Sequence, residues 1–226
     1  MEKILNGRGV LHTPDTQGRM QYAPTVILAN GEFPKNAILH EKLRCSNAII
    51  CCDGSVQKLL DFGMEPNFII GDLDSISEEN KIKFADILIL DQDENTNDLT
   101  KAVKFCINNG FDTIEILGAT GCREDHALGN ISLLADYMDM LTSVKMFTDY
   151  GVFTPISQTT TFESFPNQAV SIFSLTPETL INSENLAYPI KNRNFRSWWE
   201  GTLNRSLGNQ FTIKIDWGKI IVFQGL

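Results

Sequence analysis

Short apolar runs alternate with segments of helical period over the first two thirds of the chain. In 98–108 the apolar residues recur three and four positions apart, which predicts one apolar helix face. Similar helices are expected at 55–62 and 125–138, the latter with Leu128, Ile131, Ala135 and Met138 facing inward. The runs that predict strands lie at 26–29, 48–52, 68–71, 87–90 and 113–117. Strands alternating with helices predict an α/β fold with a doubly wound, mostly parallel sheet.

The helical period ends near residue 143, where short β-prone stretches take over. The last two, 211–216 and 219–224, flank Trp217-Gly218, and this spacing predicts a two-residue hairpin. This part is expected to form an antiparallel β-sandwich. We therefore divide the chain into an α/β domain over 22–142 and a β-sandwich domain over 143–226. Residues 1–21 show little periodicity, and we expect them to be a mobile leader.

Composition and charge narrow the classes of partner. The formal net charge of −9 repels a polyphosphate backbone, which argues against nucleic acid. The sequence contains no run of about 20 apolar residues that would span a membrane, so we expect a cytoplasmic protein. The five cysteines include no Cys-x-x-Cys pair, and the neighbours Cys51 and Cys52 leave opposite faces of one strand. Disulfides and zinc sites are therefore not expected.

Aspartates follow the predicted strands directly. Asp53 follows the second run, the third ends in Gly71-Asp72-Leu73-Asp74-Ser75, and the fourth leads into an acidic loop at 91–98. The carboxyl ends of parallel strands meet at one rim of the sheet, where such folds place their ligands. Carboxylates crowded together repel unless a cation lies among them, and Mg²⁺ is the cation that this oxygen-rich set favours. The sequence thus predicts a magnesium site.

Structural alternatives exist for the same residues. An Asp-x-Asp pair occurs in ordinary turns, and Asp98 is placed to cap the helix that follows it. Gly118-Ala119-Thr120-Gly121 is a turn between strand and helix, where backbone amides bind anions. Arg123 either contacts phosphate there or balances the charge of the acidic rim. His126 is either catalytic or a half-buried helix residue.

Four motifs in order resemble the thiamin pyrophosphokinase family. They are Asp53-Gly54, the Gly-Asp-x-Asp-Ser of 71–75, the acidic loop leading to Asp98-Leu99-Thr100-Lys101, and the Gly-x-x-Gly-x-Arg-x-Asp-His of 118–126. The resemblance continues more weakly through Asn185-Leu186-Ala187-Tyr188-Pro189 and covers nearly all of 24–224. It implies transfer of the pyrophosphoryl group of ATP to the hydroxyl of thiamin, yielding thiamin diphosphate and AMP.

The resemblance also implies roles for individual residues and a homodimer with its active sites between subunits. The implied catalytic residues are Asp72, Asp74 and Asp98. The implied Mg²⁺ ligands are Asp53, Asp72, Asp74 and Asp98. The implied ATP-binding residues are Asp53, Gly54, Asp72, Ser75, Arg123, Asp125 and His126. The implied thiamin-binding residues are Gln92, Asn97, Asn182, Ser183 and Tyr188. Either Asp72 or Asp98 would accept the proton of the attacking hydroxyl.

Two other classes of function fit part of the pattern. A metal-dependent nucleotide-sugar or nucleotidyl transferase also uses Asp-x-Asp at the rim of a sheet. A sensor that binds nucleotide or Mg²⁺ without chemistry needs the same ligands. Neither explains the ordered set of four motifs followed by a β-rich domain.

Overall fold

The computed structural model describes residues 23–226, and the leader expected at 1–21 lies outside them. The α-helices are α1 (Ala37–Cys45), α2 (Ser55–Asp61), α3 (Glu78–Lys83), α4 (Asp98–Asn108) and α5 (Glu124–Tyr137), with short 3₁₀ turns η1 (Ala85–Ile87) and η2 (Trp198–Gly201). The first strands are β1 (Thr25–Leu28), β2 (Ala48–Cys52), β3 (Phe68–Gly71), β4 (Leu88–Leu90), β5 (Thr113–Leu117) and β6 (Ser143–Thr148). The later strands are β7 (Gly151–Ile156), β8 (Thr160–Glu163), β9 (Ala169–Ser174), β10 (Asn182–Glu184), β11 (Asn204–Arg205), β12 (Gln210–Lys214) and β13 (Ile220–Gly225).

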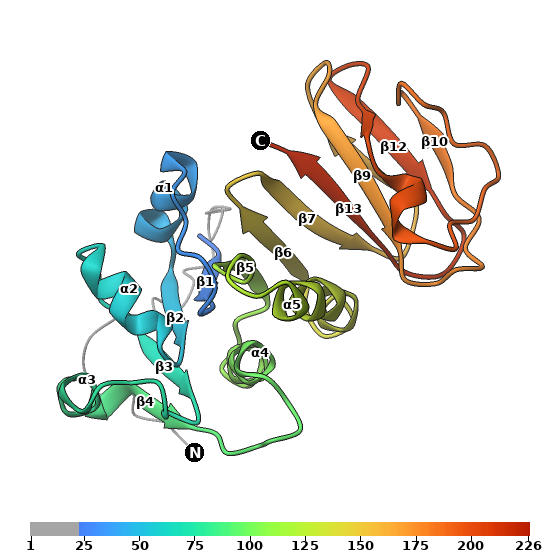
Figure 1. Ribbon diagram of the computed structural model, residues 1–226. Helices are drawn as coiled ribbons and strands as arrows, with labels where there is room; N and C mark the ends of the chain where they lie inside the picture. The colour runs from blue at the N-terminus through green and yellow to red at the C-terminus, as the bar shows by residue number, and fades with distance from the viewer. Residues whose placement is uncertain (1–22) are drawn as a thin grey trace, which may run out of the picture.

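One ten-stranded sheet runs through the molecule in the order β11-β9-β13-β7-β6-β5-β1-β2-β3-β4 (Figure 1). The six strands from β6 to β4 are all parallel, while β7, β13, β9 and β11 are antiparallel to their neighbours. A second, three-stranded antiparallel sheet has the order β10-β12-β8. The predicted fold class, a mostly parallel α/β sheet followed by an antiparallel β-sandwich, is confirmed.

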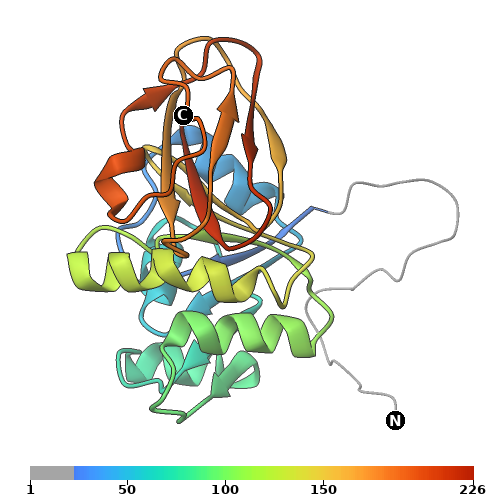
Figure 2. The ribbon, with the colours of Figure 1, turned by 90° about the vertical axis from the view of Figure 1, so that its right-hand side faces the viewer.

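Helices cover both faces of the parallel strands, as a doubly wound sheet requires. Ile27 of β1 packs with α4 and α5, whereas its neighbours Val26 and Leu28 pack with α1 and α2. Figure 2 shows α4 and α5 side by side on one face of the sheet. Cys51 and Cys52 lie in these two separate cores, as predicted, and all five cysteines are free thiols. Burial raises the pKa of the Cys51 thiol to about 12, so this thiol is inert at neutral pH.

The C-terminal core lies between the two sheets. Alternate residues of β13 separate its two faces: Ile220 and Val222 join this core, while Ile221 joins the core under α5. Phe162 of β8 and Phe211 of β12 stack at 5.0 Å between ring centroids, on the opposite side of the sandwich. The period of two in the sequence therefore builds a layer that is apolar on both faces.

Two expectations about single elements are wrong. The strands on either side of Trp217-Gly218 form no hairpin, because β12 pairs with β8 and β10 while β13 pairs with β7 and β9. Gly218 instead turns the chain from one sheet to the other, with φ +87°. Leu128 on α5 is 54% exposed rather than buried, because the packed face of α5 begins further along the helix, at Ile131.

The parallel sheet extends further than the pattern suggested. β6 begins at Ser143, where helical periodicity ends, yet it pairs in parallel with β5. The division at 142/143 thus falls inside a continuous sheet, and its use as a domain boundary stays a prediction. Among residues 23–226, no helix combines the length and the apolar character needed to cross a bilayer.

We predict that the corner at Gly218 is sensitive to a single methyl group. A Cβ there would lie 2.0 Å from Thr179 Oγ1, whereas Gly63, with nearly the same φ of +84°, has open space around it. Gly63→Ala should lower the free energy of unfolding by about 1–2 kcal/mol, from backbone strain alone. Gly218→Ala should cost about 1–3 kcal/mol more, because it adds overpacking to the same strain. Urea unfolding of the two variants measures the difference, and equal costs would contradict this account of the corner.

Candidate active site

Three aspartates meet at the carboxyl ends of β2 and β3. One carboxylate oxygen each from Asp53, Asp72 and Asp74 lies within 4.8 Å of the other two. Asp53 follows β2, and the other two follow the neighbouring strand β3. Parallel pairing therefore brings together the carboxylates that the sequence placed at one rim of the sheet.

The local backbone is shaped to allow this approach. Asp53 adopts a left-handed conformation with φ +39°, and its amide donates to the Ile70 carbonyl at 2.8 Å. A Cβ on Gly71 would lie 2.9 Å from the Cβ of Asp53 and 3.4 Å from Asp98 Oδ1. Only glycine at position 71 leaves room for the two aspartates that flank it in space.

Asp53 is an anion with an incomplete set of partners. The residue is 3% exposed, and its Oδ2 accepts a hydrogen bond from the Ser75 amide at 3.2 Å. Its Oδ1 is buried and has no hydrogen-bond partner among the described residues. Burial raises the pKa of the Asp53 carboxyl, and the charges of Asp98 and Asp72 raise it further, against the lowering effect of Ser75. An orphaned buried oxygen in an all-oxygen donor set fits a hard divalent cation such as Mg²⁺.

Asp98 reaches the same rim from the start of α4. The helix cap is Asn97, whose Oδ1 accepts from the Thr100 amide at 2.9 Å, so the expectation that Asp98 caps this helix is wrong. Asp98 Oδ1 instead accepts a hydrogen bond from Lys101 Nζ at 3.1 Å. The Asp98 carboxylate therefore does not cap α4. It faces the acidic cluster, where its charge adds to the effect of burial in raising the pKa of Asp53.

Lys101 is the functional candidate that the sequence analysis did not single out. Its side chain is only 6% exposed, although it borders the acidic cluster. Burial alone lowers the pKa of the Lys101 ammonium, but the hydrogen bond to Asp98 and the charges of Asp98, Asp72 and Asp91 outweigh burial and raise it. A lysine three residues after an aspartate in the first turn of a helix was the available signal, because the two side chains lie on the same helix face.

The acidic loop forms one wall of a cleft of about 610 Å³. The residues that line this cleft are Asp72, Gln92, Asp93, Glu94, Thr96, Asp98 and Lys101. The loop holds its shape by its own turns: the Asp93 amide donates to Asp91 Oδ1, and the Asn95 amide donates to Asp93 Oδ1, each at 3.0 Å. The backbone and side-chain amides of Asn95 lower the pKa of Asp93. Gln92 is thus placed in the cleft, whereas Asn97 caps α4 outside it.

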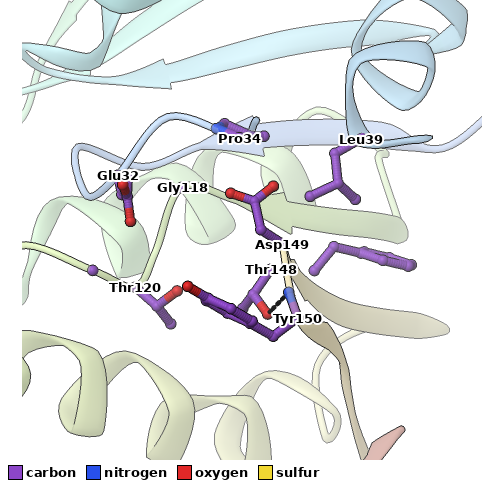
Figure 3. Close-up of a pocket in the computed structure, with 10 residues that line it drawn as sticks. Glu32, Pro34, Leu39, Gly118, Thr120, Thr148, Asp149 and Tyr150 are labelled. Atoms are coloured by element: carbon purple, nitrogen blue, oxygen red, sulfur yellow. Dashed lines mark hydrogen bonds between the residues drawn. The ribbon is translucent and has the colours of Figure 1, made fainter. Parts of the chain in front are cut away.

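The glycine turn at the end of β5 is packed against the loop that follows β1. The Gly31 amide donates to the Gly118 carbonyl at 2.7 Å, and the Glu32 amide donates to the Thr120 carbonyl at 2.8 Å. The cavity between these loops has a volume of about 70 Å³, room for only a few water molecules (Figure 3). In it, Asp149 anchors the backbone by accepting from the amides of Lys35 and Asn36. The hydrogen bonds to Asp149 stabilise the loops, and the cavity is too small for a nucleotide.

Arg123, Asp125 and His126 lie exposed at the start of α5. Arg123 Nε donates to Asp125 Oδ1 at 3.0 Å, and the His126 amide donates to the same oxygen at 2.9 Å. The guanidinium lowers the pKa of Asp125 to about 2. The cation of this turn therefore pairs with its own neighbour rather than with the acidic cluster, and His126 is exposed rather than half-buried.

The β-rich half carries a second groove, of about 390 Å³. Tyr188, Leu203 and Asn204 are among its lining residues. Asn204 is buried and holds the Tyr188 backbone from both sides, accepting from its amide at 3.0 Å and donating to its carbonyl at 2.8 Å. Tyr188 is 61% exposed, and its ring, whose centroid lies 5.8 Å from the Arg205 guanidinium, is accessible for stacking on a ligand.

Two other candidates for thiamin binding in this half use their side chains in hydrogen bonds to the backbone. Asn182 Oδ1 accepts from the Asn192 amide at 2.8 Å, and Ser183 Oγ accepts from the Ile190 amide at 2.9 Å. Neither lines the groove beside Tyr188. Their role in thiamin binding stays a prediction.

Family models account for both halves of the chain. The model described as thiamin pyrophosphokinase, catalytic domain, matches residues 39–147, and the model described as thiamin pyrophosphokinase, substrate-binding domain, matches residues 151–223. The chain belongs to the thiamin pyrophosphokinase family. The resemblance found in the sequence motifs is thereby confirmed, and the acidic cluster and the cleft both lie within the catalytic-domain match.

Curated relatives carry the same family name. The chain is 34% identical over 98 residues to thiamine pyrophosphokinase of Bacillus subtilis (strain 168), covering 42% of this chain and 45% of that protein. It is 32% identical over 104 residues to thiamin pyrophosphokinase 1 of Caenorhabditis elegans, covering 42% of each. These matches span less than half the length of either relative.

Solved structures of family members share the fold over most of the chain. The B. subtilis thiamine pyrophosphokinase structure has a TM-score of 0.75 at 21% identity, covering 89% of this chain and 98% of that one. Yeast thiamin pyrophosphokinase also has a TM-score of 0.75, at 17% identity, covering 90% of this chain and 86% of that one. The arrangement of the two sheets is therefore the family fold.

We predict opposite effects of Asp53→Asn with and without metal. Asparagine tolerates the left-handed backbone and removes a buried charge, so without divalent ions the variant should melt no lower than the wild type. Mg²⁺ at about 100 times its dissociation constant should stabilise the wild type by about 2.7 kcal/mol. The variant should gain less than half of this in the same thermal unfolding experiment.

The control is Asp216→Asn, an exposed aspartate of the β-rich half. It should match the wild type with and without Mg²⁺. An Asp53→Asn variant that gains as much from Mg²⁺ as the wild type would remove Asp53 from the metal site.

Proposed function

We propose that the chain is a Mg²⁺-dependent thiamin pyrophosphokinase that transfers the pyrophosphoryl group of ATP to the hydroxyl of thiamin. The products are thiamin diphosphate and AMP. The observation that carries the proposal is the convergence of Asp53, Asp72 and Asp74 beside a cleft that also holds Asp98 and Lys101. The two family matches support the substrate pair.

The roles of the carboxylates are assigned from the exposure and the hydrogen bonds of each. Mg²⁺ held by Asp53, Asp72, Asp74 and Asp98 would neutralise charge on the phosphate oxygens during transfer. Asp72 is exposed and lines the cleft, and it keeps a carboxylate oxygen that faces solvent. Asp98 Oδ1 is already occupied, because it accepts a hydrogen bond from the Lys101 ammonium. Of the two proposed proton acceptors, we therefore favour Asp72 for the hydroxyl of thiamin.

The nucleotide is assigned to the rim between the aspartates and the start of α5. Gly54 and Ser75 stand next to each other there, since a Cβ on Gly54 would lie 3.2 Å from Ser75 Cβ. Arg123 supplies a planar fork for phosphate oxygens, in exchange for its pairing with Asp125. His126 follows on the same exposed turn of helix. These positions would hold ATP against the metal at the carboxyl ends of the parallel strands.

The thiamin site is assigned to two surfaces, the acidic cleft and the groove beside Tyr188, which lie far apart in one chain. β3, which precedes Asp72, and β11, which contains Asn204, stand eight places apart in the ten-stranded sheet. At about 4.8 Å per strand this is on the order of 30–40 Å, far beyond the length of thiamin. Figure 1 shows β4 and β10 at opposite ends of the molecule. We therefore propose a homodimer in which Tyr188 of one subunit stacks on thiamin at the acidic cleft of the other.

The compartment is part of the same proposal. Five free thiols fit a reducing compartment, and we place the enzyme in the cytoplasm. Neither nucleic acid nor a membrane enters the proposed reaction.

The direct test is incubation of the purified protein with ATP, Mg²⁺ and thiamin, with ion-exchange separation of the nucleotides. AMP should appear in step with thiamin diphosphate and should be absent without thiamin. ADP would mean ordinary phosphoryl transfer. Turnover of a sugar nucleotide, or binding of ATP without any product, would favour the transferase or the sensor instead.

Asp72→Asn should lower kcat by at least about 100-fold, because it removes both a metal ligand and the proposed proton acceptor. The melting temperature should stay within a few degrees of the wild type, since Asp72 is exposed. Asp86→Asn, an exposed aspartate of η1 outside the cleft, should retain full activity. A folded Asp72→Asn enzyme with near-normal kcat would refute the metal assignment.

Mixing two impaired variants, assayed at a thiamin concentration far below the KM of the Tyr188→Ala enzyme, tests the shared active site. Tyr188→Ala should raise the KM for thiamin with little change in ATP binding, because it removes the stacking surface. Hybrid dimers of Asp72→Asn with Tyr188→Ala should each contain one intact site, so that random mixing restores about a quarter of the sites. Activity that stays at the sum of the two separate variants would show that each chain builds its site alone.

A further inference from the structure

Lys101 is a buried lysine whose ammonium group borders the cleft. Its stem lies on the packed side of α4 beside Ala102, and the whole residue is 5% exposed. Its ammonium nevertheless borders the cleft, among the residues that line it. Buried lysines are rare and need partners for their charge.

The ammonium has one protein partner for three N–H donors. Within residues 23–226, Lys101 Nζ makes a single hydrogen bond, to Asp98 Oδ1 at 3.1 Å. The remaining donors are not used by a carbonyl or another carboxylate of the described chain. Because the stem is enclosed, the ammonium cannot swing out to solvent as a surface lysine does.

The neighbouring Lys104 shows what an ordinary lysine of this helix looks like. It stands one turn further along α4, its side chain is 50% exposed, and its Nζ lies 3.8 Å from Asp93 Oδ2. It does not line the cleft. The two lysines therefore differ in burial and placement while sharing the helix and the sign of the nearest charge.

We propose that Lys101 binds a phosphate oxygen of the nucleotide through the donors that Asp98 leaves free. This inference rests on the proposed function and adds a protein cation to a site otherwise built from carboxylates. ATP carries more negative charge than the metal ions and Arg123 neutralise next to so many aspartates. A fixed ammonium at the floor of the cleft offers that charge without the mobility of an exposed side chain.

A purely structural role predicts a different outcome. If Lys101 only positions Asp98 through their hydrogen bond, any residue that donates a hydrogen bond to Asp98 should serve once Mg²⁺ is saturating. Lys101→Gln keeps a donor for Asp98 and removes the charge, and Lys101→Met removes both. The two variants therefore separate positioning of Asp98 from binding of phosphate.

The experiment measures binding of α,β-methylene ATP by calorimetry at saturating Mg²⁺. Both Lys101→Met and Lys101→Gln should bind the analogue about 10- to 100-fold more weakly than the wild type, the range expected for a lost charge-assisted hydrogen bond. The matched control Lys104→Met should stay within about twofold of the wild type, where only a surface charge is removed. Thiamin binding should be unchanged in all three.

Wild-type affinity in Lys101→Gln would overturn the inference and leave Lys101 as a positioning residue for Asp98. Its failure is distinct from failure of the proposed function, which would appear as a wild-type protein that binds no analogue and releases no AMP. If both Lys101 variants fail to fold, proton–nitrogen NMR of the wild-type lysine ammonium groups decides the matter. Adding the analogue with Mg²⁺ should slow proton exchange of one buried ammonium, and an unchanged spectrum would refute the contact.

Discussion

Mutual repulsion among carboxylates is the constraint on which the catalytic half depends. Parallel strands bring Asp53, Asp72 and Asp74 together, and helix α4 adds Asp98. The free energy of such a cluster is unfavourable in a partly buried place, as the raised pKa of Asp53 indicates. The chain offsets it with directed donors, the amide of Ser75 and the ammonium of Lys101. These donors leave Asp53 Oδ1 unsatisfied, and the proposed divalent cation would satisfy it.

The rest of the fold holds the cluster in this unfavourable state. Buried apolar residues on both faces of β1 to β5 fix the strand ends, so the aspartates cannot separate to relieve their repulsion. Left-handed Asp53 and unsubstituted Gly71 let two strand ends approach more closely than ordinary residues allow. Stability supplied by the two cores thus maintains a site that is unstable by itself, and metal binding recovers part of that cost.

Much of this arrangement was predictable from the sequence, because period and strand-end chemistry are local signals. The helix at 98–108 and the acidic rim both follow from spacing. The absence of a hairpin at Trp217-Gly218 was not predictable, since the turn residues say nothing about which sheet each strand joins. Leu128 was misplaced because the register of α5 on the sheet depends on β6, β7 and β13. Lys101 was not identified as a site residue from the sequence, because burial is what distinguishes it from Lys104, and burial is a property of the packed molecule.

The single sheet explains why two binding surfaces of one chain are so far apart. β6 continues the parallel strands and β7 reverses direction beside it, so the β-rich half is fused to the edge of the catalytic sheet rather than folded back over the cleft. A flexible linker would let Tyr188 reach the aspartates of its own chain, but ladder hydrogen bonds through β6, β7 and β13 forbid that motion. Rigid continuity of the sheet therefore keeps the groove beside Tyr188 away from the acidic cleft of its own chain, which is why we propose that it serves another subunit. In the proposed dimer, the same rigidity would fix the distance between the two active sites and would make catalysis depend on dimer formation.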